Sequence, residues 1–166
     1  MKTITRFQAQ KMLEALGGMA LGHLATEDLE RVIDNFDILK VEVEKLDKMK
    51  TELSKRIYQD IEQGRLQKFF ETIQKNDTET LNKEYADLLP LRIKEVDVVI
   101  SLYNKQIDVD LKEIDSKDFR KAVIKAQPDT KQGVFSILAP IFKAEEVKEE
   151  RKIIQNLRNS SSKFHH

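Results

Sequence analysis

The longest regular pattern of apolar and polar positions lies between residues 27 and 63. Apolar side chains recur there at steps of three and four residues, with charged residues over most positions between them: Leu29, Val32, Phe36, Leu39, Val43, Leu46, Leu53 and Ile57. This spacing is typical of the a and d positions of a coiled coil and predicts one long helix, which Gly64 ends or interrupts. Lys50 takes a core-type position in this seam, where we expect its stem to lie along the apolar side chains with the ammonium in water.

A second apolar pattern follows a loop signal at residues 76–78. Its side chains again step by three and four: Leu81, Tyr85, Leu89, Ile93, Val96, Ile100 and Tyr103. Pro90 falls within this return segment and must begin a new helix or kink the existing one. Because a short connection joins two such patterns, we expect residues 27–104 to form a long antiparallel coiled-coil-like helical hairpin.

The stretch 91–104 has a second interpretation. Val96, Val98 and Ile100 alternate with other residues, and β-branched side chains are dense there, as in a strand. We favour the helix and keep the strand as the alternative, because the choice decides what the next segment can pair with.

A clean alternation of apolar and acidic residues follows immediately. It consists of Ile107, Asp108, Val109, Asp110 and Leu111. This period of two predicts a half-buried strand, whose three apolar side chains face the core while the two aspartates face solvent. The paired carboxylates could bind a metal or act as an acid–base pair, but we favour the solvated side of an edge strand, because no histidine or calcium-type glycine loop accompanies them.

This strand needs a neighbour for its backbone donors and acceptors. If 96–100 is a strand, it pairs with this one and 101–106 is a hairpin loop. If 91–104 is helical, the nearest apolar candidate in the chain is 134–138, whose own strand signal is poor. We therefore predict that residues 107–111 lie at or near an intermolecular contact, made by strand addition with a second copy or a partner protein.

The remaining segments complete a single predicted domain over residues 1–158. The segments in chain order are an N-terminal helix (5–22), the helical hairpin (27–104), a small mixed lobe (107–142), a charged C-terminal helix (144–158) and a disordered or tag-derived tail (159–166). The first helix begins with Thr5 and Gln8 at the spacing of a capping box. The predicted fold class is mainly α, with a long helical hairpin and a small α+β C-terminal lobe.

Charge and residue counts narrow the possible functions. The chain carries 29 basic (Lys and Arg) and 29 acidic residues, so its formal net charge is zero, whereas a general nucleic-acid binder would carry a basic excess. It has no cysteine and three histidines, of which His165 and His166 end the sequence. A di-metal bundle needs more histidines than His23 alone, and a catalytic triad would have to use His23 as its base. The sequence has no phosphate-binding glycine loop. We expect no catalytic residue, cofactor, metal or small-molecule substrate, and so an interaction protein.

No segment has the composition of a membrane span or an export signal. A spanning helix needs about 20 predominantly apolar residues, and a secretory signal needs an uninterrupted apolar run after a basic start. The most apolar early stretch, 12–25, contains Glu14 and His23. We expect a cytoplasmic protein with no membrane partner.

One aromatic pair is a further candidate for partner binding. Phe69 and Phe70 could form an exposed anchor, or they could belong to the core at the tip of the hairpin. Neighbouring residues on a helix lie about 100° apart, so one ring can be buried while the other is less so.

The order of these elements resembles a known group of proteins. The resemblance rests on LEAL (13–16), NKEYADLL (82–89) and IDVDLKEIDSKDF (107–119), which follow one another around the long charged hairpin. The chain is similar in layout to small uncharacterised proteins of tailed bacteriophages and prophages. This implies a non-enzymatic accessory or assembly protein of the bacterial host cytoplasm or the virion. The alternative is a host-defence antagonist that binds a host protein or a nucleotide signal as a helical oligomer.

Overall fold

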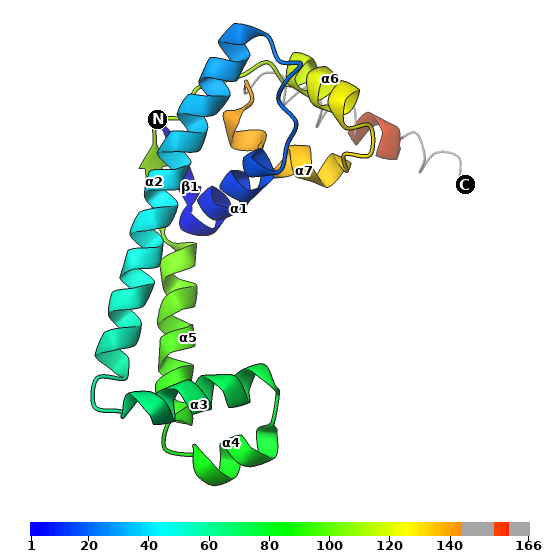
Figure 1. The fold of residues 1–166 in the computed structure, drawn as a ribbon. Coiled ribbons are helices and arrows are strands. Elements are labelled where there is room, and N and C mark those ends of the chain that lie inside the picture. Colours follow the sequence, from blue (N-terminus) through cyan, green and yellow to red (C-terminus); the bar gives the residue numbers. More distant parts are fainter. Residues whose placement is uncertain (144–154, 160–166) are drawn as a thin grey trace. The chain divides into compact units, whose positions relative to one another are not determined.

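The structure, a computed structural model, describes residues 1–143 and 155–159 (Figure 1). These residues are mainly helical and contain one small sheet, so the predicted mainly α fold class is confirmed. The chain divides into two compact units. The first unit is Met1–Glu42 together with the chain from Gln106 onward, and the second is Val43–Lys105.

The first unit combines helices with the two strands. Its elements are β1 (Lys2–Thr5), α1 (Arg6–Gly17), the first part of α2 (Thr26–Ile57), β2 (Gln106–Val109), α6 (Ser116–Ala126), α7 (Gln132–Ile137) and a 3₁₀ helix at Ala139–Ile141. One core is built from all of them, with buried side chains that include Ile4, Met12, Val32, Leu39, Val109, Phe119, Phe135 and Ile141. The mixed lobe therefore shares its core with the N-terminal segment and α2.

The capping box predicted at the start of the first helix is present. Thr5 Oγ1 accepts a hydrogen bond from the Gln8 backbone N–H at 3.0 Å, and Gln8 Oε1 accepts one from the Thr5 N–H at 2.8 Å. The helix ends at Gly17, earlier than the predicted residue 22. Gly18 follows as its C-cap, because two adjacent glycines weaken helix propagation.

The second unit contains the rest of α2 with α3 (Gln63–Gln74), α4 (Thr78–Glu84) and α5 (Leu89–Asn104). Here α2 and α5 run antiparallel, as the order of their contacts shows. Lys50 Nζ donates to the Tyr103 hydroxyl at 2.8 Å, and the hydroxyl of Tyr58, the residue after α2, donates to Glu95 at 3.3 Å. A later residue on the first segment thus contacts an earlier residue of α5. The predicted pairing of the long helix with the return segment is therefore present, with two short helices between them.

The boundaries of the long helix differ from the prediction. α2 ends at Ile57, and a new helix begins at Gln63, so the continuous helix through residue 63 is wrong. Glu62 causes the restart, because its carboxylate accepts hydrogen bonds from the backbone N–H groups of Gly64 and Arg65 and caps α3. These hydrogen bonds also lower the pKa of Glu62, which favours the charged cap at neutral pH.

Residues 91–104 are helical, so the favoured interpretation of this stretch is confirmed and the strand alternative is wrong. Pro90 lies in the first turn of α5, where a missing N–H costs no helical hydrogen bond. Most of the predicted C-terminal helix (144–154) and the last seven residues of the predicted tail (160–166) lie outside the described residues, and 155–159 are helical.

The seam of α2 predicted from the sequence carries the core of both units, which gives a test. Leu39 and Leu46 are fully buried, whereas Val41 on the same helix is 50% exposed. We expect Leu39→Ala and Leu46→Ala each to lower the free energy of unfolding by about 2–5 kcal/mol, because each leaves a cavity. Val41→Ala is the control and should change it by no more than about 0.5 kcal/mol. Urea denaturation measures all three, and equal effects at the three positions would contradict the buried seam.

Candidate protein-binding surfaces

The strand predicted at 107–111 is present over Gln106–Val109, in a two-stranded antiparallel sheet, and Asp110 and Leu111 lie just beyond its end. β2 pairs with β1 so that Ile107 lies opposite Ile4 and Asp108 opposite Thr3. The apolar side chains turn toward the core while the aspartates are exposed, so the predicted facing is confirmed. Thr3 Oγ1 donates to Asp108 at 2.6 Å on the solvent side of the sheet.

The partner strand is one that the sequence analysis missed. Residues 2–5 (Lys-Thr-Ile-Thr) are rich in β-branched side chains, which indicates a strand. The segment is short and leads directly into a capping box, so only the following helix was predicted. Neither 134–138 nor a second copy is needed to give β2 a neighbour. Among the described residues each strand pairs only with the other, so each keeps one edge without a strand partner. Strand addition at 107–111 stays a prediction.

A buried asparagine fixes the chain just after β2. Asn35 of α2 is fully buried, and its amide makes two hydrogen bonds to the backbone of Lys112. The Lys112 N–H donates to Asn35 Oδ1 at 2.7 Å, and Asn35 Nδ2 donates to the Lys112 carbonyl at 3.0 Å. The side-chain amide therefore satisfies both backbone groups of Lys112, as a neighbouring strand would.

The aromatic pair belongs to the core of the second unit. Phe69 is fully buried and contacts Tyr85, so the interpretation of Phe69 as an exposed anchor is wrong. Phe70 is partly buried, with its ring edge-to-face against Tyr58 at 5.4 Å and the guanidinium of Arg92 above it at 5.8 Å. These rings are held by intramolecular contacts, in a core that also contains Leu66, Ile73 and Leu81 of α3 and α4.

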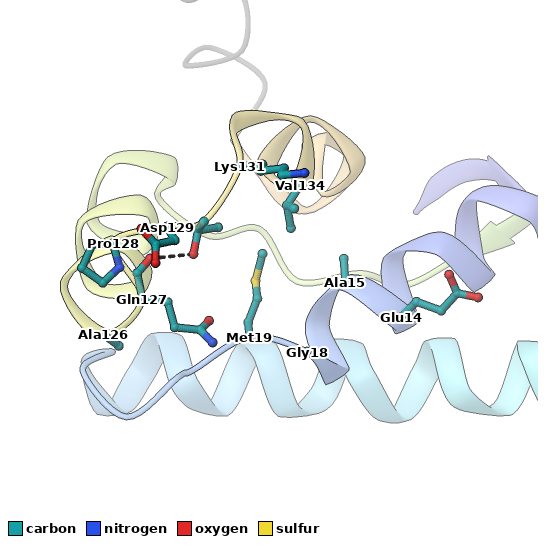
Figure 2. Close-up of a pocket in the computed structure, with 11 residues that line it drawn as sticks. Glu14, Ala15, Gly18, Met19, Ala126, Gln127, Pro128, Asp129, Lys131 and Val134 are labelled. Atoms are coloured by element: carbon teal, nitrogen blue, oxygen red, sulfur yellow. Dashed lines mark hydrogen bonds between the residues drawn. The ribbon is translucent and has the colours of Figure 1, made fainter.

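A cavity of about 620 Å³ lies in the first unit, between the end of α1 and the loop that joins α6 to α7 (Figure 2). Met19 and Val134 give it an apolar side, and Asp129 and Lys131 lie on the loop. Gln127 holds the loop in place, since its Oε1 accepts a hydrogen bond from the Ala20 N–H at 3.1 Å.

Acidic side chains line part of this cavity. Glu14 is one of its acidic lining residues, and hydrogen bonds from Gln10 and Lys11 lower the pKa of its carboxyl. The described part of the chain contains no group of three or more His, Cys, Asp or Glu that could hold a metal ion.

The helix α5 has two apolar faces. The inner face packs inside the second unit through partly buried residues such as Leu91, next to the fully buried Leu88 just before the helix. The outer face carries Ile93, Val96 and Ile100, whose side chains are 62%, 38% and 52% exposed. These three residues, called the α5 outer stripe below, belong to the pattern that the sequence analysis assigned to the hairpin interior, so that assignment is wrong for them.

The sequence pattern assigned the outer face of α5 to the core because a charged residue occupies the centre of its inner face. Glu95 is only 6% exposed and receives hydrogen bonds from the Tyr58 hydroxyl and from Arg92. Such a network makes a buried carboxylate tolerable, but no sequence periodicity reveals it. The outer face, which is uniformly apolar, therefore resembles a core more closely than the actual core face does.

No helix in the described part of the chain is long and apolar enough to cross a membrane. No family model, no curated protein and no solved structure matches this chain.

The contact between Asn35 and Lys112 predicts a specific loss of stability. Asn35→Asp replaces the Nδ2 donor by an oxygen that faces the Lys112 carbonyl, and an unsatisfied buried group costs about 1–3 kcal/mol. We expect at least this decrease in the free energy of unfolding at pH 7, measured by urea denaturation. The control is the reciprocal change one residue earlier, Asp34→Asn, at an exposed position. If the two variants were equally stable, the amide would not hold the strand.

The buried network of α5 predicts a pH dependence. Burial and the nearby charge of Glu95 raise the pKa of Tyr58 from 10.0 to about 12. Between these values the unfolded chain loses a proton that the folded protein keeps, so stability falls as the pH rises through this range. Urea denaturation should show a shallower fall for Tyr58→Phe than for the wild type. Tyr85→Phe retains Tyr58 and should follow the wild type; identical slopes for all three proteins would contradict this prediction.

Proposed function

We propose that this protein is a non-enzymatic interaction protein of the phage or prophage accessory or assembly class, which acts in the bacterial cytoplasm by binding another protein chain through the α5 outer stripe. The observation that supports binding is the exposure of Ile93, Val96 and Ile100 on one face of a helix whose opposite face is already packed.

An apolar face on a helix normally packs against another surface. α5 carries aliphatic side chains on its exposed stripe, although its inner face, where Glu95 is buried, is already packed. Fully burying an isoleucine contributes about 1.5–3 kcal/mol, so covering these half-exposed side chains would contribute on the order of 1 kcal/mol each. In the free protein these side chains remain in contact with water, so their burial against another protein surface would favour association.

The proposed class of protein comes from the order of elements rather than from a site. The long helix, the return helix and the acidic alternating strand occur in the sequence order of the phage and prophage proteins that this chain resembles. An accessory or assembly role agrees with an exposed apolar helix face that another chain can cover.

The test is capture of a protein that depends on the stripe. Affinity-tagged wild type would be expressed beside an untagged copy in an infected or lysogenic bacterial culture, and retained proteins would be identified by mass spectrometry. Ile100→Lys places a charge in the stripe and should lower the retention of at least one protein by about tenfold or more, a difference of about 1.4 kcal/mol. Ser101→Lys adds the same charge at the next exposed residue and is the matched control.

Retention that is equal for the wild type, Ile100→Lys and Ser101→Lys would show that no chain binds the stripe. Circular dichroism of the variants should match the wild type, because both changed positions are exposed.

A further inference from the structure

The α5 outer stripe is bordered by two charges of opposite sign. Lys94 and Asp97 are exposed, and both lie on the same flank of the stripe, at successive turns of the helix. Within the described residues neither side chain makes an ion pair or a hydrogen bond. An apolar stripe with one free cation and one free anion beside it can be complementary to itself.

We propose that the chain that covers the α5 outer stripe is a second copy of this protein, with the two α5 helices antiparallel. This inference rests on the proposed function and names its partner. In a two-fold pair the same surface of each copy forms the interface, so each contact occurs twice. Ile93 of each copy then lies opposite Ile100 of the other, the two Val96 side chains meet near the two-fold axis, and the stripes cover one another.

Helix geometry shows that the charges agree with this arrangement. Antiparallel helices place equivalent flanks together, so Lys94 of one copy and Asp97 of the other lie on the same side of the contact. When Ile93 lies opposite Ile100 of the second copy, these two charges differ in height by two residues, which is about 3 Å at 1.5 Å per residue. Two equivalent ion pairs between Lys94 and Asp97 therefore border the contact on one flank, one on each side of the two-fold axis.

A parallel pair of α5 helices would place a different cation beside Asp97 and would disrupt a contact inside each copy. It would bring Asp97 toward Arg92 of the second copy, because residues five apart on opposite flanks meet in a parallel pair. Arg92 already binds the buried carboxylate of Glu95 and covers the ring of Phe70. Moving it away would leave a buried carboxylate without its cation, which is strongly destabilising. Lys94 has no such competing contact, so the antiparallel pair is favoured.

The size of the stripe sets the strength of the dimer. Three exposed aliphatic side chains on a 16-residue helix make a contact smaller than the roughly 800 Å² per partner of a standard stable complex. Dimerisation should therefore depend on protein concentration. It also should respond to charge, because the two ion pairs are a large part of so small an interface.

The experiment is sedimentation equilibrium of the full chain over a range of concentrations that extends into the hundreds of micromolar. The wild type should show a monomer–dimer equilibrium. Ile100→Lys should abolish it. Asp97→Lys should weaken dimerisation by about tenfold, because two ion pairs become two like-charge contacts. The double variant Lys94→Asp/Asp97→Lys exchanges the two charges and should restore dimerisation to within about threefold of the wild type. Glu52→Lys makes the same charge change at an exposed position of α2 and should leave the equilibrium unchanged.

Three outcomes would overturn the inference. A dimer that Asp97→Lys weakens and the double variant does not restore would show a parallel or unrelated contact. A dimer that Ile100→Lys leaves intact would lie elsewhere on the molecule. A wild type that stays monomeric throughout would exclude the second copy; if capture still depended on Ile100, a different protein would be the partner and the proposed function would stand, whereas loss of both results would remove the two proposals together.

Discussion

The continuous apolar seam of α2 is the constraint on which the rest of the structure depends. This helix is 32 residues long, or about 48 Å, and a seam of that length cannot be covered by one small group of side chains. Val32 and Leu39 enter the core of the first unit, while Ile57 packs against the core of the second. Each unit can therefore be understood as the set of segments that covers one part of the same helix.

Polar groups inside the two units fix positions that apolar packing leaves free. Asn35 satisfies both backbone groups of Lys112, and Glu95 is held by Tyr58 and Arg92. Hydrophobic contacts are nondirectional, whereas a buried amide or carboxylate must meet its partners at hydrogen-bond distance. These two residues thereby determine where the chain leaves β2 and which face of α5 turns inward. The inward placement of Glu95 leaves the α5 outer stripe exposed.

Both proposals concern that exposed face. The candidate surfaces differ in how far the sequence alone predicted them. The alternation at 107–111 indicated both the strand and the facing of its side chains, because a period of two needs no tertiary information. The aromatic pair was ambiguous, because the sequence could not show that α3 and α4 would fold against Tyr58. The stripe was mistaken for core, since its spacing is that of a packed helix and only the position of Glu95 reveals the other face.

The sequence by itself determined the local features: the seam of α2, the capping box at Thr5 and the new helix that begins beside Pro90. Each depends on residues within a few positions of one another. Only the tertiary structure decided that residues 2–5 pair with β2, that Asn35 binds Lys112 and that α5 turns a charged face inward. Those contacts join residues about 40 to more than 100 positions apart, where loop closure and competition among similar apolar surfaces determine the partner.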